Sequence, residues 1–170
     1  LAGAAIRLMD PQRAGAREIL ETARETEATL LFAFPGLLRS VIGQTPERAG
    51  KSLRLVRLGG DTILWRDIDQ LRAWLGPEAA IQLVYAATEA PMMQWFAHDS
   101  CRLEDARAPI GYPLQGNRLA IVDEAGEPVG PGQAGELVVD SRYVSLGAWR
   151  DGRWAPAPPV FRTGDLGRQR

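Results

Sequence analysis

The chain has 170 residues, of which 45% are hydrophobic and 24% are charged, and its formal net charge is −1. This length and apolar content predict a soluble globular chain the size of one ordinary domain. A nearly balanced charge without runs of one sign argues against nucleic-acid and membrane-surface partners. No stretch approaches the roughly 18 apolar residues of a membrane span. The single cysteine, Cys101, excludes an internal disulfide and fits the reducing cytoplasm.

Residues 1–108 alternate between strand-like and helix-like patterns. The strands are predicted over residues 4–10, 28–34, 53–58 and 80–85. Helices are predicted from the N-cap pair Asp10 and Pro11 through residue 23, over residues 37–42, and over residues 68–75, where apolar side chains recur at helical spacing. Near-continuous apolar strands joined by helices are typical of an α/β fold, in which helices cover both faces of a parallel sheet.

Residues 109–170 are predicted to be rich in β-structure. The stretch "NRLAIVDEAGEPV" (117–129) has the pattern of a hairpin that turns at residues 124–126, and "ELVVD" (136–140) reads as a further strand. This change of pattern predicts a sub-domain boundary near residue 108. The two predicted parts are an α/β sub-domain, 1–108, and a small β-rich sub-domain, 109–170.

Loops that follow the predicted strands define a candidate site, because ligands bind beyond the carboxyl ends of parallel strands. The loops are residues 34–36, 59–61 and 86–89. Thr88 and Glu89 offer a hydroxyl and a hard oxygen ligand, which suit phosphate and Mg²⁺, and Tyr85 offers a face for an aromatic ring. Thr88 could equally cap a helix with Glu89 in its first turn. The residues alone leave both interpretations open.

Four stretches together resemble the adenylate-forming superfamily, which includes peptide-synthetase adenylation domains, acyl-CoA synthetases and luciferases. "LVYAATEA" (83–90) is similar to the Tyr-Gly-x-Thr-Glu motif of that superfamily. The others, in the expected order, are "LRLVRLGGDTI" (53–63), "APIGYPLQGNRLAIVDEAGEPVGPGQAGELVV" (108–139) and "FRTGDLGR" (161–168). The long third stretch is most similar to the amino-acid adenylation domains of nonribosomal peptide synthetases.

The resemblance implies ATP and Mg²⁺ as cofactors and assigns roles by motif. Thr88 would contact the α-phosphate, Glu89 would hold Mg²⁺, Tyr85 would stack on adenine, and Asp165 would accept both ribose hydroxyls. The residues that would border the nucleotide are Gly59, Gly60, Asp61 and Ala86. The apolar residues that would line the substrate pocket are Phe32, Val56, Leu58, Val84, Met92 and Met93. Strand-end apolar residues are commonly core residues, so this last set has a second interpretation.

The implied function is activation of a small carboxylic acid, in particular an amino acid, as an acyl adenylate for transfer to a carrier-protein thiol. Because the chain begins at Leu1 and contains no phosphate loop ending in lysine, we expect a fragment whose N-terminal and C-terminal parts are missing. Its only lysine is Lys51, and Arg170 precedes the expected lid domain. An isolated fragment of this kind is expected to be inactive.

Three alternatives stay open at this point. Ala86, Ala87, Leu83 and Ala148 depart from the family pattern, which would suit a degenerate, non-catalytic sub-domain serving as a structural platform in a megasynthase. An acyl-CoA synthetase fragment is the second alternative, and an unrelated doubly wound nucleotide or flavin binder is the third. His98 lies outside every motif and is interpreted as a loop histidine, whereas Trp149 and Trp154 are interpreted as packing residues.

Overall fold

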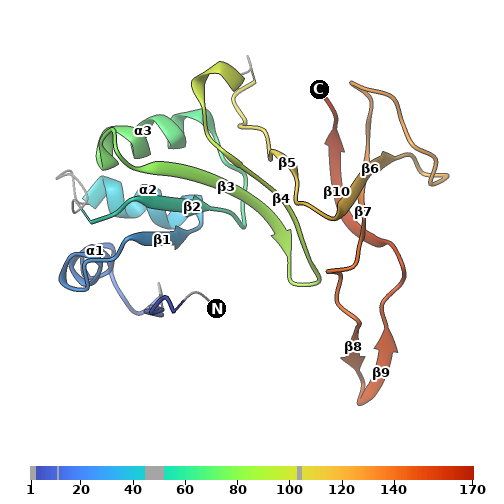
Figure 1. Ribbon diagram of the computed structural model, residues 1–170, viewed down its shortest axis with the longest axis horizontal. Helices are drawn as coiled ribbons and strands as arrows, with labels where there is room; N and C mark the ends of the chain where they lie inside the picture. The colour runs from blue at the N-terminus through green and yellow to red at the C-terminus, as the bar shows by residue number, and fades with distance from the viewer. Residues whose placement is uncertain (1–2, 11, 45–51, 103–104) are drawn as a thin grey trace. The chain divides into compact units, whose positions relative to one another are not determined.

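The computed structural model describes residues 3–10, 12–44, 52–102 and 105–170 (Figure 1). The chain forms two compact units. Unit 1 comprises Leu1–Leu83 and Phe96–Pro109, and unit 2 comprises Val84–Trp95 and Ile110–Arg170. Pro11 and Lys51, which entered the sequence interpretation, lie outside the described residues. Within the described ranges, no helix is both long enough and apolar enough to cross a bilayer.

Unit 1 confirms the predicted α/β fold with a parallel sheet. Its strands are β1 (Leu30–Ala33), β2 (Leu55–Leu58) and the start of β3 (Ala80–Ala87), and its helices are α1 (Ala16–Glu25), α2 (Pro35–Gln44), α3 (Trp65–Leu75) and the short 3-10 helix η1 (Asp99–Cys101). The strands β1, β2 and β3 are parallel, and Leu31, Val56 and Ile81 lie side by side in register. Helix α1 packs against α2, and α2 packs against α3 (Figure 1).

The two faces of this parallel sheet differ in burial. Because side chains alternate along a strand, Val56 and Leu58 point to one face and are completely buried. Phe32, which pairs with Arg57, lies on the other face and keeps 65% of its surface exposed. The core of unit 1 therefore lies on the face of Val56 and Leu58.

The N-terminal segment differs from its prediction as a strand. Residues 4–10 adopt no regular structure, and Ile6 and Leu8 are 84% and 87% exposed. An apolar run forms a strand only where a neighbour satisfies its backbone groups, and no described strand pairs with this segment. Asp10 does not cap α1, because the helix begins only at Ala16 and its N-cap is Gly15. Asp10 instead belongs to a separate turn, in which its Oδ1 accepts from the Gln12 amide at 2.9 Å and its carbonyl accepts from the amides of Arg13 and Ala14.

An ion pair between the buried Asp67 and the partly exposed Arg39 joins α2 to α3. Arg39 donates from Nε to Asp67 Oδ1 at 2.8 Å and from Nη2 to Oδ2 at 3.0 Å, and the Leu64 amide also donates to Oδ2 at 2.9 Å. Burial disfavours the charge on Asp67, but the hydrogen bonds from Arg39 and Leu64 outweigh it and hold the pKa of this carboxyl below its ordinary value. The pair thus fixes the first turn of α3 to its neighbour.

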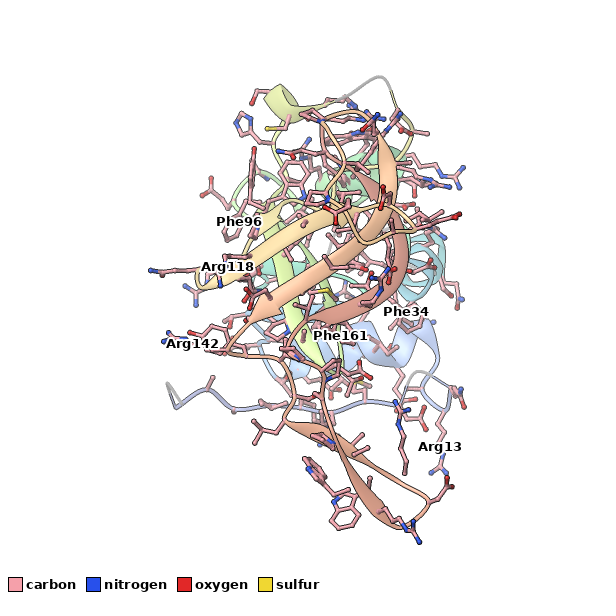
Figure 2. The ribbon with its side chains drawn as sticks, turned by 90° about the vertical axis from the view of Figure 1, so that its right-hand side faces the viewer. Arg13, Phe34, Phe96, Arg118, Arg142 and Phe161 are labelled. Atoms are coloured by element: carbon pink, nitrogen blue, oxygen red, sulfur yellow. The ribbon has the colours of Figure 1, made fainter. Side chains whose placement is uncertain are left out.

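Unit 2 is built from antiparallel strands. They are β4 (Ala90–Phe96), β5 (Tyr112–Pro113), β6 (Asn117–Val122), β7 (Ala134–Ser141), β8 (Gly147–Arg150), β9 (Arg153–Pro156) and β10 (Phe161–Arg168). β10, β7 and β6 form a three-stranded sheet in that order, β8 pairs with β9, and β4 lies between β3 and β5. Ala90, Met92 and Val139 are the buried centre of the unit, and Phe161 packs against them. Figure 2 shows Arg118 of β6 and Arg142, in the turn after β7, projecting on the same side.

The turn predicted at residues 124–126 is confirmed, because the amide of Gly126 donates to the Asp123 carbonyl at 3.0 Å. The predicted hairpin is also present, because the Asp123 amide donates to the Glu127 carbonyl and the Val129 amide donates to the Ile121 carbonyl, both at 2.9 Å. β6 pairs along its whole length with β7, and the chain beyond the turn returns through a single bridge between Val122 and Pro128. The missing amide proton of Pro128 costs no hydrogen bond at this bridge, because the amides of Asp123 and Val129 make the bonds on either side of it.

We expect Asp67→Asn to lower the free energy of unfolding by about 1–3 kcal/mol, because the substitution removes the charge that compensates Arg39. Since the folded pKa of Asp67 lies below the unfolded value, its contribution is present above the unfolded pKa and is lost as the pH falls through the folded pKa. Denaturant melts at neutral and acidic pH measure both effects.

Asp69→Asn is the matched control, because Asp69 pairs with Arg102 at an exposed position of the same helix. Exposed ion pairs contribute little to stability, so this variant should remain close to the wild type. Equal losses in the two variants would contradict a special role for Asp67.

Candidate functional site

Thr88 and Glu89 form the two-residue turn of the hairpin between β3 and β4, and both side chains are exposed. No helix begins here, so the interpretation of Thr88 as a helix cap is wrong. The local residues suit a helix start and a tight turn equally, and the pairing of β4 beside β3 decides between them. The Glu89 carbonyl accepts a hydrogen bond from the amide of Ser145 at 2.7 Å, which fixes the backbone of the turn.

Tyr85 and Asp165, 80 positions apart in the sequence, are in direct contact within unit 2. The Tyr85 hydroxyl donates a hydrogen bond to Asp165 Oδ2. Tyr85 is half-buried against the cluster around Met92 and Val139, whereas Asp165 is exposed. Burial, followed by the hydrogen bond to Asp165, raises the pKa of Tyr85 to about 12. The phenol is therefore a protonated donor throughout the physiological range.

Asp165 stands at the end of a bulge in β10. Arg162 pairs with Val138 and Leu166 pairs with Glu136, so residues 163–165 lie opposite the single residue Leu137 of β7. Thr163 Oγ1 donates to the Leu137 carbonyl at 2.8 Å and accepts from the Asp165 amide at 3.0 Å. A bulge re-aims the side chains that it carries, and here it presents Asp165 to solvent.

Glu136 of β7 holds this bulge in place. Its Oε1 accepts from the Gly164 amide at 3.1 Å, and its Oε2 accepts from Arg162 Nε at 3.0 Å. The hydrogen bond from Arg162, followed by that from the Gly164 amide, holds the pKa of Glu136 below its ordinary value. Gly164 has a φ of +76°, a conformation that glycine adopts without strain. Glu136 was not among the predicted site residues, although it lies in the "GEL" stretch that supported the resemblance.

Gly135, the neighbour of Glu136, lies where β6 approaches too closely for any side chain. A Cβ atom on Gly135 would lie 2.3 Å from the carbonyl oxygen of Val122 on β6, so only glycine fits this close approach. The "GEL" stretch thus sets the packing of β7 against β6 and the bulge of β10. The "RTGD" stretch supplies the bulge itself.

The residues predicted to border the nucleotide from unit 1 lie beyond the carboxyl end of β2. The Gly59 amide donates to the Ala33 carbonyl of β1, and Gly60 is exposed. Asp61 is also exposed and accepts from the Thr62 amide at 2.6 Å. In unit 2, Ala86 is exposed near the end of β3. Their contact with a nucleotide stays a prediction.

The six predicted pocket residues have different surroundings. In unit 1, Val56 and Leu58 are fully buried on one face of the sheet, while Phe32 lies on the other, where the guanidinium carbon of Arg57 is 6.0 Å from its ring centre. In unit 2, Met92 is 1% exposed, and Met93 packs against the same cluster. Val84 is half-buried. Within unit 1, Phe32 does not share a face with Val56 and Leu58, and a pocket role for these residues stays a prediction.

Residues interpreted as lying outside the site also have clear environments. His98 Nδ1 accepts a hydrogen bond from the Ser100 amide at 3.2 Å at the start of η1, which confirms it as a loop histidine. Trp149 and Trp154 pack edge to face across the β8–β9 pair, with ring centres 6.0 Å apart. They remain 72% and 49% exposed, so they contact each other but are not buried in unit 2.

Glu89 is the carboxylate that the resemblance assigns to Mg²⁺. Among the residues that the structure describes, no three His, Cys, Asp or Glu side chains gather as a metal cage. Mg²⁺ is commonly held by one or two carboxylates, with substrate phosphates and water completing its octahedron. An exposed carboxylate at a hairpin tip fits that mode of binding.

Comparisons with known proteins identify the family of the chain. The sequence profile of the family of AMP-binding enzymes matches residues 1–149, so the chain belongs to that family. It is 32% identical over 160 residues to the L-proline–[L-prolyl-carrier protein] ligase of Streptomyces coelicolor, covering 87% of this chain. It is 37% identical over 125 residues to the salicyl-AMP ligase/salicyl-S-ArCP synthetase of Mycobacterium tuberculosis, covering 71% of this chain.

The chain spans 29% of the length of the prolyl ligase and 21% of that of the salicyl ligase. The crystal structure of CmiS6 matches with a TM-score of 0.76 and 29% identity, covering 90% of this chain and 40% of CmiS6. These matches confirm the resemblance to adenylate-forming enzymes and the α/β fold. They also show that the chain corresponds to part of longer proteins among its relatives.

A phenol titration tests the Tyr85–Asp165 contact. We expect one phenol to ionise near pH 12, because burial and the Asp165 carboxylate both disfavour phenolate at Tyr85. The raised pKa stabilises the folded state below the ordinary phenol pKa of about 10, and this contribution is lost as the pH rises toward 12. Phenolate absorbance in the near ultraviolet should lose this last transition in Tyr85→Phe and retain it in Tyr112→Phe. A phenol titration in which every midpoint lies near pH 10 would contradict the contact.

Proposed function

We propose that the full-length protein activates a small carboxylic acid, in particular an amino acid, with ATP and transfers the acyl group to a carrier-protein thiol. The observation that carries the proposal is the contact between Tyr85 and Asp165, which brings the "YAATE" and "RTGD" stretches together in unit 2. Their family roles both concern the nucleoside of ATP. Glu89, in the turn just beyond Tyr85, has its carboxylate exposed.

The reaction proceeds in two balanced steps. A carboxylate oxygen of the acid attacks the α-phosphorus of ATP, and the bond from that phosphorus to the bridging oxygen breaks, so pyrophosphate leaves with the electron pair. The thiol sulfur then attacks the acyl carbonyl, AMP leaves, and the thiol proton passes to solvent or a base. In-line displacement at phosphorus depends mainly on positioning and charge stabilisation.

Residues of this chain would bind and orient the nucleotide. The Asp165 carboxylate has two oxygens that match the vicinal ribose hydroxyls, and the Tyr85 ring offers a face to adenine. The Thr88 hydroxyl would donate to the α-phosphate, and Glu89 would hold Mg²⁺. When bound, Mg²⁺ offsets negative charge on the phosphates.

The relatives favour a carrier protein as the acceptor. The names of the prolyl ligase and of the salicyl ligase both specify transfer to a carrier protein, and we extend that acceptor class to this protein. A degenerate, non-catalytic platform is the second candidate, because Ala86 and Ala87 depart from the family pattern next to Thr88. Exchange of labelled pyrophosphate into ATP by the full-length protein, dependent on an added acid, separates the two.

We expect Glu89→Gln in the full-length protein to lower this exchange rate about tenfold or more, because it removes the charge that holds Mg²⁺ against phosphate. Excess Mg²⁺ should restore part of the rate. The melting temperature should move little, since Glu89 is exposed in a turn. Glu124→Gln, in the exposed turn after β6, is the control. Unchanged exchange in Glu89→Gln would rule out the metal-ligand role.

Asp165→Asn should weaken ATP binding by about 1–3 kcal/mol, because a neutral amide keeps one acceptor but loses the charge-assisted hydrogen bond. The KM for ATP should rise while the KM for the acid stays near its wild-type value. Asp151→Asn is a suitable control, since Asp151 lies in the β8–β9 turn at a φ of +49°, where asparagine is also tolerated. A rise confined to the KM for the acid would contradict the assignment of Asp165 to the ribose of ATP.

A further inference from the structure

We propose that Tyr85 is a positioning residue whose hydroxyl fixes the Asp165 carboxylate in the orientation that receives the ribose hydroxyls of ATP. This inference rests on the proposed function, which assigns Asp165 to the ribose. It gives the hydroxyl of Tyr85 a task that is separate from any contact of its ring with adenine. The carrying observation is the hydrogen bond from Tyr85 to Asp165 Oδ2.

The two partners differ in how firmly the fold holds them. Tyr85 lies on β3, half-buried against the cluster of Ala90, Met92 and Val139, so its hydroxyl has a defined position. Asp165 is exposed, and its backbone is held by the bulge while its carboxylate could still rotate. A bond from the packed residue to the exposed one removes that freedom, which is how a supporting side chain preorganises a binding group.

The bond leaves the carboxylate able to bind a ligand. An ionised carboxylate has about four acceptor positions, and the Tyr85 hydroxyl uses one of them. A vicinal diol supplies two hydroxyl donors, which the remaining positions can accept. Tyr85 and the ribose can therefore bind Asp165 together.

The Tyr85 hydroxyl also stays protonated, so it remains a hydrogen-bond donor. The Tyr85 phenol keeps its proton up to a pKa of about 12, so it donates to Asp165 at every pH at which an enzyme of this kind would work. Thr163 supports the same arrangement from the backbone side, because its hydroxyl accepts from the Asp165 amide and donates to the Leu137 carbonyl. Asp165 is thus held at its backbone amide by Thr163 and at its carboxylate by Tyr85.

Two other roles for Tyr85 make different predictions. If only the ring matters, Tyr85→Phe binds ATP like the wild type, because phenylalanine keeps the aromatic face. If the hydroxyl competes with ribose for Asp165, Tyr85→Phe binds ATP more tightly. The positioning role requires weaker binding of ATP and, in addition, weaker discrimination between ribose and deoxyribose.

The experiment compares ATP with 2′-deoxyATP in the full-length wild type and in Tyr85→Phe, by acid-dependent pyrophosphate exchange. We expect the KM for ATP to rise about three- to tenfold in Tyr85→Phe, as the loss of a hydrogen bond to a charged group predicts, with a smaller change in kcat. The ratio of the KM for 2′-deoxyATP to that for ATP should fall toward one. An unchanged or lower KM for ATP, or an unchanged ratio, would overturn the inference.

Control variants separate this role from a structural one. Tyr112→Phe alters a tyrosine of β5 that is 67% exposed and should change neither KM. Asp165→Asn and the double variant with Tyr85→Phe complete a cycle, and coupling is expected because the hydroxyl acts through the carboxylate. Additive losses would overturn the positioning role. If Tyr85→Phe does not fold, that variant gives no support to the inference. The ratio of the KM for 2′-deoxyATP to the KM for ATP in Asp165→Asn then decides, and an unchanged ratio overturns the inference.

Failure of the proposed function has a different signature. If the wild type shows no acid-dependent exchange and binds no ATP in equilibrium dialysis, the proposed function fails and the inference falls with it. If the wild type exchanges and discriminates against 2′-deoxyATP while Tyr85→Phe does the same with equal constants, only the inference fails.

Discussion

The carboxylate of Glu136 is the group on which the candidate site depends. It accepts from the amide of Gly164 and from the guanidinium of Arg162, and both donors belong to the interrupted part of β10. Without an acceptor at this point, the bulge would leave a backbone amide and an arginine without their partners. A charged acceptor makes such hydrogen bonds stronger than a neutral one would. Glu136 thus holds the bulge that carries Asp165, while Thr163 and Tyr85 bind Asp165 itself.

This arrangement gives a physical reason for two sequence stretches that would otherwise be only a pattern. In "GEL", the glycine permits β6 to approach, the glutamate holds the bulge, and the leucine carbonyl accepts from Thr163. In "RTGD", the arginine and the glycine amide donate hydrogen bonds to the glutamate, and the resulting bulge exposes the aspartate. The two stretches thus form a single structural device.

Much of unit 1 could be predicted from the sequence, because amphipathic helices and apolar strands depend on local spacing. α1 begins to bury its apolar face at Ala16, as the spacing of Ala16, Ile19 and Leu20 indicated. Residues 4–10 could not be predicted in the same way, since a strand requires a partner that the local sequence does not reveal. The turn at Thr88 could not be predicted either, because its residue types also suit the start of a helix.

The sequence could assign residues to the candidate site but could not show their contacts. Tyr85 and Asp165 were assigned through the resemblance, whereas their hydrogen bond depends on a register shift in β10 that spacing cannot show. The placement of Phe32 and Val56 on opposite faces likewise depends on the register of β1 against β2. Pairing register is a tertiary property, and a shift of one residue exchanges the two faces.

The hydrogen bond from the Ser145 amide to the Glu89 carbonyl has a consequence for how this region can vary. Both groups belong to the main chain, so the bond is indifferent to the side chains at the two positions, with the sole exception of a proline at 145, which has no amide proton. Substitutions can therefore accumulate in this loop and in the turn without moving the backbone that carries Glu89. The backbone of the turn therefore does not depend on the side chain at position 89. A variant without the Glu89 carboxylate would still fold in the same way.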